Sequence, residues 1–242
     1  MGNILEFQDI NAGYGRIQIL NDLSFTVNEG QVFGVIGPNG SGKTTMFNAL
    51  LGLIKPSSGR ILFDSIDITR TPSNVRCKMG LGRTFQVPKP FENMSLYENV
   101  LVAAVHGASN NERFGRELAL GILKQTGLYE KRELTAGKLT LLDRKRLEIA
   151  RALGTSPKLL LLDEVAAGLT DAEVKDIMKL VADLKAAGHS IIWIEHIIET
   201  MIGSTDALMC MAEGKCIMVG DPQEVISSEE VQRLYLGVDD NE

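Results

Sequence analysis

The sequence has few cysteines, and their spacing gives no sign of a disulfide framework. Cys77, Cys210 and Cys216 form an odd-numbered set without a C-x-x-C spacing in a chain of 242 residues. This pattern argues against both disulfides and a zinc site, and it is typical of reduced thiols in a cytosol. We therefore expect all three cysteines to be packing residues.

The sequence also lacks long apolar runs and an excess of basic residues. Its apolar runs, such as residues 100–105 and 159–162, are far shorter than the roughly 20 residues of a membrane-spanning helix. The net charge of −6 provides no basic surface for a phosphate backbone, so we expect no nucleic-acid partner. The first residues lack the basic and apolar regions of a signal peptide, so we expect the protein to stay where it is made. Any membrane role would then depend on a partner.

The first quarter of the sequence has the pattern of antiparallel strands that lead into an α/β core. Residues 4–10, 17–27 and 31–36 alternate apolar and polar side chains, with glycine-containing turns between them. The third segment ends in a glycine-rich loop, and residues 44–54 after it have helical spacing. Residues 60–63 predict a further short strand.

The remainder of the chain alternates helical and apolar segments. Residues 95–153 are mostly helical in pattern, with breaks at 107–111 and 135–138. Short apolar runs at 159–162 and 190–194 predict buried parallel strands. The segment between them predicts a helix that begins at a capping box of Thr170 and Glu173 and stops at Gly188. A hairpin turning at 213–214 and short helices within 222–236 follow.

These elements predict one α/β domain, residues 1–242, with a mixed sheet. The proline-rich stretch 87–90 fits neither a helix nor a central strand, so we place a lobe boundary there. Residues 1–86 and 155–242 are expected to form the core, which includes an antiparallel β subdomain. Residues 87–154 are expected to form a helical subdomain.

The glycine-rich loop carries a phosphate-binding motif. Residues 37–44 read Gly-Pro-Asn-Gly-Ser-Gly-Lys-Thr and satisfy G-x-x-x-x-G-K-S/T between a strand and a helix, the context that the motif requires. Backbone amides of such a loop surround phosphate oxygens, and the lysine reaches the β and γ phosphates. A plain glycine-rich turn is the alternative, and the strand and helix argue against it. The predicted binding residues are Asn39, Gly40, Ser41, Gly42, Lys43, Thr44 and Thr45, with the Thr44 hydroxyl on Mg²⁺.

Two acidic residues follow the apolar run at 159–162. Asp163 and Glu164 would lie at the carboxyl end of a buried strand, the edge where α/β sheets bind ligands. Asp163 is expected to hold Mg²⁺, and Glu164 to act as the general base that polarises the attacking water. The alternative is that these two acidic residues only end a strand at the surface. The phosphate-binding motif upstream argues against this alternative.

With these motifs in place, the sequence resembles the ABC transporter ATPases over nearly its whole length. The resemblance implies that Tyr14 stacks on adenine, that Gln86 touches Mg²⁺ and the attacking water, and that His196 contacts the γ-phosphate. An exposed loop tyrosine is the alternative for Tyr14, and His196 taken alone would more often be a packing residue. Their order along the chain favours the functional roles. The resemblance implies an ATP-hydrolysing enzyme that uses ATP and Mg²⁺.

Several runs look more narrowly like ATPases of branched-chain amino-acid importers. They include residues 80–86, 90–94, 98–100 and 146–153. Such importers combine two membrane permease subunits, two ATPase subunits and a solute-binding protein. The resemblance therefore implies a cytoplasmic subunit, peripheral on the inner face of the membrane, whose helical subdomain meets a permease helix near Gln86 and Phe91. Two ATPase subunits would enclose two ATP molecules and separate after hydrolysis.

The sequence departs from the family at the signature motif, usually Leu-Ser-Gly-Gly-Gln, which completes the partner's ATP site. The aligned residues 139–143 read Leu-Thr-Leu-Leu-Asp. Thr140 keeps a hydroxyl that would bind the γ-phosphate in trans, whereas Asp143 would add negative charge near that phosphate. This predicts an asymmetric motor in which the site built on this chain is the more active one. The basic residues that follow, Arg144, Lys145, Arg146 and Arg151, predict a solvated helix face.

Two other functions stay open. One is an ABC ATPase that serves no importer, for instance in lipid or polysaccharide export or as a soluble factor. The other is a regulatory nucleotide-binding module without useful hydrolysis, which the altered signature would permit.

Overall fold

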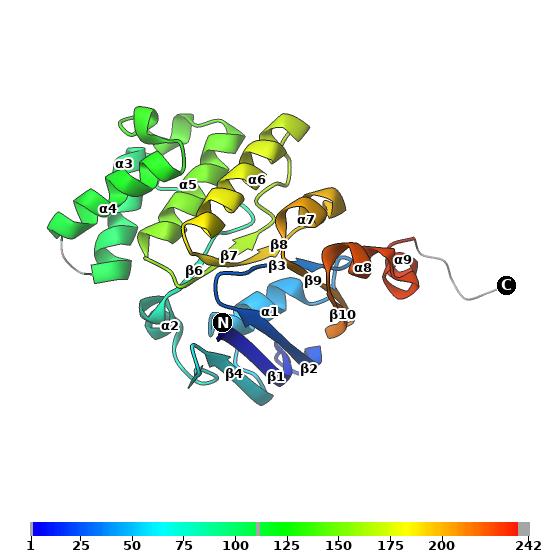
Figure 1. Cartoon of the computed structure of the whole chain (residues 1–242). Coiled ribbons are helices and arrows are strands. Elements are labelled where there is room, and N and C mark those ends of the chain that lie inside the picture. The colour runs from blue at the N-terminus through cyan, green and yellow to red at the C-terminus, as the bar shows by residue number, and fades with distance from the viewer. Residues whose placement is uncertain (1, 110–111, 237–242) are drawn as a thin grey trace. The chain divides into compact units, whose positions relative to one another are not determined.

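The structure is a computed structural model that describes residues 2–109 and 112–236 (Figure 1). The chain divides into two compact units. The first unit contains the residues up to Arg76 and those from Ser190 on, and the second unit contains Cys77–His189. The predicted helical subdomain, residues 87–154, falls inside the second unit, and its boundaries remain a prediction.

The first unit begins with the expected antiparallel sheet. Its strands are β1 (Asn3–Tyr14), β2 (Ile17–Asn28), β4 (Ser58–Phe63) and β5 (Ile66–Asp67), in the order β2-β1-β4-β5. β1 extends beyond the predicted residue 10 because its pairing with β2 shifts after Phe7, near Asp9, whose φ is +51°. Such a bulge lets a strand continue with a changed register. The amide of Asp9 still makes a hydrogen bond, because it donates to Ser24 Oγ at 2.8 Å.

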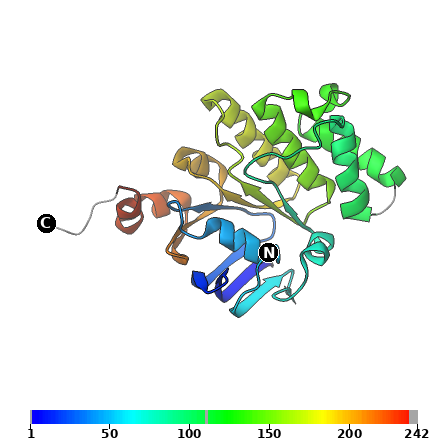
Figure 2. The ribbon, with the colours of Figure 1, turned by 180° about the vertical axis from the view of Figure 1, so that it is seen from behind.

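A mixed sheet forms the other part of the first unit. β3 (Val32–Ile36) pairs in parallel with both β8 (Ser190–Ile194) and β9 (Ala207–Ala212), and β10 (Lys215–Gly220) pairs antiparallel with β9. Every residue of β3 and β8 is buried, as expected for central parallel strands. The helices of this unit are α1 (Lys43–Leu50), α7 (Ile198–Ser204), α8 (Pro222–Ser227) and α9 (Glu229–Leu236). Figure 2 shows α1 alongside the antiparallel sheet, which it contacts through β1 and β2.

The second unit is mainly helical and contains one pair of parallel strands. β6 (Leu81–Arg83) pairs with β7 (Leu159–Asp163), and α2 (Ser73–Met79) runs across the division between the units. α3 (Leu96–Ala103), α4 (Glu112–Gln125) and α5 (Leu141–Gly154) contact one another (Figure 1). α6 (Asp171–Ala186) begins at the predicted capping box, in which Thr170 Oγ1 accepts from the Glu173 amide and the Glu173 carboxylate accepts from the Thr170 amide.

The predicted breaks within residues 95–153 are only partly present. A π-helix, η1 (Ala104–Ser109), continues α3 through Gly107. Glycine allows close packing against Thr155 there, since a Cβ would lie 2.8 Å from Thr155 Cγ2. Residues 110–111 of this break lie outside the described residues. Short 3₁₀ turns form η2 (Tyr129–Lys131) and η3 (Ala136–Lys138), the second within the other predicted break. Across the described ranges, no helix combines the length and apolar character needed to span a membrane.

Candidate nucleotide-binding site

The glycines of the phosphate-binding motif shape the turn between β3 and α1. Gly40 and Gly42 have φ values of +81° and +103°, which side chains other than glycine rarely adopt, and Gly42 is the residue that precedes the first turn of α1. A Cβ on Gly37 would lie 2.2 Å from the carbonyl oxygen of Met211 on β9. The turn therefore needs glycine for both its conformation and its close packing, and it leads directly into the start of a helix.

Lys43 lies across this turn. Its side chain is buried, and Nζ donates to the carbonyl oxygens of Gly37 at 2.7 Å and Pro38 at 3.0 Å, and to Ser41 Oγ at 3.4 Å. No acidic residue stands in the first turn of α1, so the helix N-terminus and the ammonium favour an anion together. Thr44 is exposed at the same helix start and Thr45 is buried. These residues fit a triphosphate, with the Thr44 hydroxyl available to a hard cation.

Tyr14 and His196 are the other predicted site residues of the first unit. Tyr14 ends β1 and is 47% exposed, and its hydroxyl accepts from Asn48 Nδ2 on α1 at 2.8 Å. His196 follows β8, which pairs in parallel with β3 through Val35 and Ile194. Because parallel strands end at a common edge, His196 and the phosphate-binding turn both follow the carboxyl edge of this sheet.

The second unit brings Gln86 and Glu164 together. The two residues follow the parallel strands β6 and β7, and Gln86 Nε2 donates to Glu164 Oε2 although 78 positions separate them in the chain. Glu164 has a φ of +48°, in the left-handed region that residues other than glycine seldom adopt. The carboxylate predicted as general base is therefore held by the amide predicted to touch the attacking water.

Asp163, the predicted Mg²⁺ ligand, ends β7 and is 4% exposed. Its Oδ2 accepts from Arg83 on β6 at 2.7 Å, and its amide donates to Thr84 Oγ1 at 3.1 Å. A carboxylate at this depth needs such a partner, because an unpaired buried charge is costly. Arg83 was not among the predicted site residues. Its position three residues before Gln86 was the sequence feature that could have indicated a role for Arg83 at the site.

The basic residues of α5 do not form the predicted solvated face. Lys145 is 3% exposed and donates to two backbone carbonyls, while Arg146 pairs with Asp176 at 3.1 Å and Arg151 with Glu148 at 2.6 Å. Arg144 donates to the carbonyl oxygens of Leu139 and Gly137. The prediction was wrong because α5 is enclosed by its neighbours, so each cation finds a partner inside the unit.

The altered signature stretch lies at the start of α5. Thr140 Oγ1 accepts from the Asp143 amide at 3.3 Å and so caps the helix. The Asp143 side chain is buried and its Oδ2 accepts from Lys131 Nζ at 2.5 Å. The negative charge expected near a partner's phosphate is therefore paired within this chain, whereas Thr140 and Leu141 are exposed, Leu141 at 43%.

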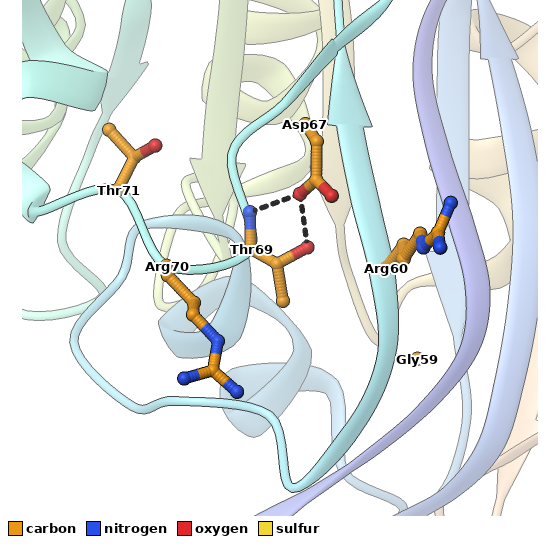
Figure 3. Close-up of a pocket in the computed structure, with 6 residues that line it drawn as sticks. All are labelled: Gly59, Arg60, Asp67, Thr69, Arg70 and Thr71. Atoms are coloured by element: carbon orange, nitrogen blue, oxygen red, sulfur yellow. Dashed lines mark hydrogen bonds between the residues drawn. The ribbon is translucent and has the colours of Figure 1, made fainter.

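One hollow in the first unit contains none of the predicted site residues. It measures about 580 Å³ and is lined by Gly59, Arg60, Asp67, Thr69, Arg70 and Thr71 (Figure 3). The side chains of Arg60 and Arg70 start from separate segments, and their guanidinium groups lie apart in Figure 3. Asp67 accepts from the Thr69 hydroxyl at 2.6 Å and the Thr69 amide at 2.9 Å, and these bonds lower the pKa of its carboxyl group.

A glycine turn between a buried strand and a helix, with a lysine across it, defines a P-loop nucleoside triphosphatase. Comparison with known proteins identifies the family within this class. A family model described as ABC transporter matches residues 20–167. The chain therefore belongs to the ABC transporter family, as an ATP-binding subunit.

Individual relatives match over nearly the full chain. The chain is 37% identical to the lipopolysaccharide export system ATP-binding protein LptB of Acidithiobacillus ferridurans, with 98% of each protein covered. It is 33% identical to the high-affinity branched-chain amino acid transport ATP-binding protein BraF of Pseudomonas aeruginosa, over 97% of this chain and 98% of that protein. A solved ATP-binding cassette of an ABC transporter in its ADP conformation is 32% identical, with a TM-score of 0.88 over 98% of this chain and 100% of that chain.

Family membership establishes the coarse activity. The chain has the ABC ATPase fold, binds ATP with Mg²⁺ as the usual partner ion, and hydrolyses ATP to power transport. ABC ATPase subunits dimerise and work with membrane permease subunits.

Proposed function

We propose that Glu164 is the general base of ATP hydrolysis in this chain and that Gln86 positions it. The observation that carries this proposal is the hydrogen bond from Gln86 Nε2 to Glu164 Oε2 at the ends of two parallel strands. A carboxylate oriented by an amide can hold a water molecule for in-line attack on a phosphate. His196 is proposed to contact the γ-phosphate.

The nucleotide is held, in this proposal, by residues 39–45 and by Tyr14, which stacks on adenine. Lys43 neutralises the β and γ phosphates, and Thr44, Asp163 and Gln86 are proposed Mg²⁺ ligands. The ion would supply charge neutralisation on the phosphates. Thr140 is proposed to reach the γ-phosphate bound by a partner ATPase. Its present role as helix cap supports a fixed position for the hydroxyl.

The test is Glu164→Gln in the assembled transporter. This change keeps the shape and the hydrogen-bonding capacity toward Gln86 but removes the base, so ATP binding should be retained while turnover falls by at least about 100-fold. Steady-state phosphate release and binding of a fluorescent ATP analogue measure the two quantities. Turnover within about twofold of the wild type would remove Glu164 from the catalytic role.

The proposed partners are two membrane permease subunits and a second ATPase, which would place the protein at the inner face of the membrane. Phe85, Val87 and Phe91 are 52%, 65% and 45% exposed, and this apolar surface supports docking of a permease helix. The helical subdomain, residues 87–154, is proposed to move relative to the core, residues 1–86 and 155–242, when the ATPase dimer closes and opens.

For the cargo, we propose lipid or glycolipid export as the first candidate. The 37% identity to LptB of Acidithiobacillus ferridurans supports it over the amino-acid import that the sequence runs first indicated. Import of branched-chain amino acids is the second candidate, supported by the 33% identity to BraF and by residues 80–86. An importer would also require a solute-binding protein.

Reconstitution separates these candidates. The chain is purified with the permease subunits that bind it and placed in proteoliposomes. Stimulation of its ATPase by lipopolysaccharide, without leucine uptake, supports export. ATP-dependent leucine uptake that requires a solute-binding protein would contradict export and support import.

A further inference from the structure

We propose that Lys145 is a positioning residue for ATP hydrolysis, and this inference depends on the proposed role of Glu164. Lys145 Nζ donates to the carbonyl oxygen of Glu164 at 2.9 Å and to the carbonyl oxygen of Gln86 at 3.1 Å. One ammonium group therefore joins α5 to the two segments that carry the proposed base and its hydrogen-bonding amide. Lys145 acts on the backbone of these residues and not on the nucleotide.

The burial of Lys145 calls for a specific reason. Its exposed fraction is 3%, and in the part of the chain that the structure describes only Lys43 is a comparably buried lysine. Removing an ammonium group from water costs several kcal/mol unless fixed acceptors replace the water. If α5 only needed to fill this space, an apolar side chain of similar volume would do so without that cost. The carbonyl oxygens of Gln86 and Glu164 are the fixed acceptors that replace this water, and the lysine at position 145 donates to both.

The backbone at Glu164 shows what those donors stabilise. With a φ of +48°, Glu164 has a left-handed backbone conformation. This conformation is unfavourable for a residue with a side chain and persists only when neighbouring groups hold it. The Glu164 carbonyl accepts from Lys145 at 2.9 Å and, less closely, from the Ala167 amide at 3.3 Å. The carboxylate at the other end of the residue accepts from Gln86. Lys145 therefore fixes the turn from which the proposed base projects.

Loss of Lys145 would act on catalysis more than on nucleotide affinity. The phosphate-binding turn, Tyr14 and His196 belong to the first unit, whereas Lys145, Gln86 and Glu164 belong to the second. A relaxed turn would misplace the Glu164 carboxylate while the residues that grip the phosphates keep their own contacts. Misplacement of a catalytic group by about 1 Å can cost on the order of 100-fold in rate.

The experiment compares three variants in the assembled transporter. Lys145→Met removes the donors but keeps most of the length of the side chain, and Lys145→Arg keeps a cationic donor. Leu123→Ala, at a fully buried position of α4, serves as a control for general destabilisation because it leaves a cavity. For each variant, kcat and KM for ATP, the affinity for a fluorescent ATP analogue and the thermal unfolding midpoint are measured.

We expect Lys145→Met to lower kcat by at least about tenfold while KM and nucleotide affinity stay within about threefold, and Lys145→Arg to recover part of the lost kcat. Leu123→Ala should lower the unfolding midpoint without this split between kcat and KM. The inference is overturned if Lys145→Met keeps kcat within about twofold of the wild type, or loses kcat only in proportion to stability as Leu123→Ala does. If Glu164→Gln itself leaves turnover intact, the proposed function fails instead.

Discussion

Replacing Arg76 by methionine is expected to destabilise the first unit strongly. The Arg76 side chain is 1% exposed, and its guanidinium donates to the carbonyl oxygens of Ala49 at 2.8 Å and Leu50 at 2.7 Å, at the end of the phosphate-loop helix α1. It also donates to the carbonyl oxygens of Thr71 at 2.8 Å and Thr69 at 3.1 Å. Burial lowers the pKa of Arg76 to about 10, so the group is still a cation at neutral pH and favours the negative end of α1.

The size of the effect follows from these four carbonyl oxygens. The Ala49 carbonyl also accepts from the Gly52 amide at 3.1 Å, so it keeps a partner when the guanidinium is removed. The other three lose a charged donor, and at about 1 kcal/mol for each the free energy of unfolding should fall by about 3 kcal/mol. For a chain of this length, that loss corresponds to a midpoint lower by about 6–12 °C.

Thermal unfolding followed by far-ultraviolet circular dichroism measures this change in the purified chain. Lys78→Met is the matched control, because Lys78 is exposed on the same helix and its replacement should change the free energy of unfolding by less than about 0.5 kcal/mol. Arg76→Lys should fall between the two, since an ammonium keeps the charge but has fewer donors. Equal midpoints for Arg76→Met and Lys78→Met would show that the guanidinium does not hold the end of α1.

Two further predictions concern pH and the assembled complex. Burial lowers the pKa of His189 below its usual value, so the unfolded chain binds the proton more readily and stability should fall as pH decreases through and below about 6.5. His189→Gln should flatten this slope in a series of unfolding midpoints, and an unchanged slope would assign it to other groups. If a second, different ATPase completes the transporter, Glu164→Gln here should reduce turnover more than the equivalent change in that partner, because leucines replace both signature glycines. Equal losses in phosphate release would contradict the asymmetric motor.

The parts of the structure that short-range chemistry determines were predictable from the sequence. The capping box of Thr170 and Glu173 and the hairpin turn at Glu213 and Gly214 formed as expected, because each depends on residues a few positions apart. Lys43 also starts its helix as the motif requires. In each case, residues within one short stretch of sequence determine the side-chain contact or the φ value that the local geometry needs.

The contacts that organise the second unit were not predictable in this way. Arg83 and Asp163 are 80 positions apart, and Lys145 reaches a residue 59 positions before it and another 19 positions after it. Which strand lies beside which, and how α5 is enclosed, decides these pairs, and no periodicity within one segment carries that information. A charged residue on a helix was therefore assigned to solvent by default.

Lys145 and Lys43 differ in how much of their surroundings the local sequence specifies. Both lysines are buried, and both donate to backbone carbonyl oxygens. Lys43 was predicted because the motif specifies three other positions around it, Gly37, Gly42 and Thr44, whereas Lys145 stands in a run of basic residues that is compatible with an exposed face. The physical reason for both is the same, since a buried ammonium has to replace water with fixed acceptors. Burial of a cation against backbone carbonyls near a strained residue is thus a signal that only the folded chain provides, and at Glu164 it coincides with the proposed base.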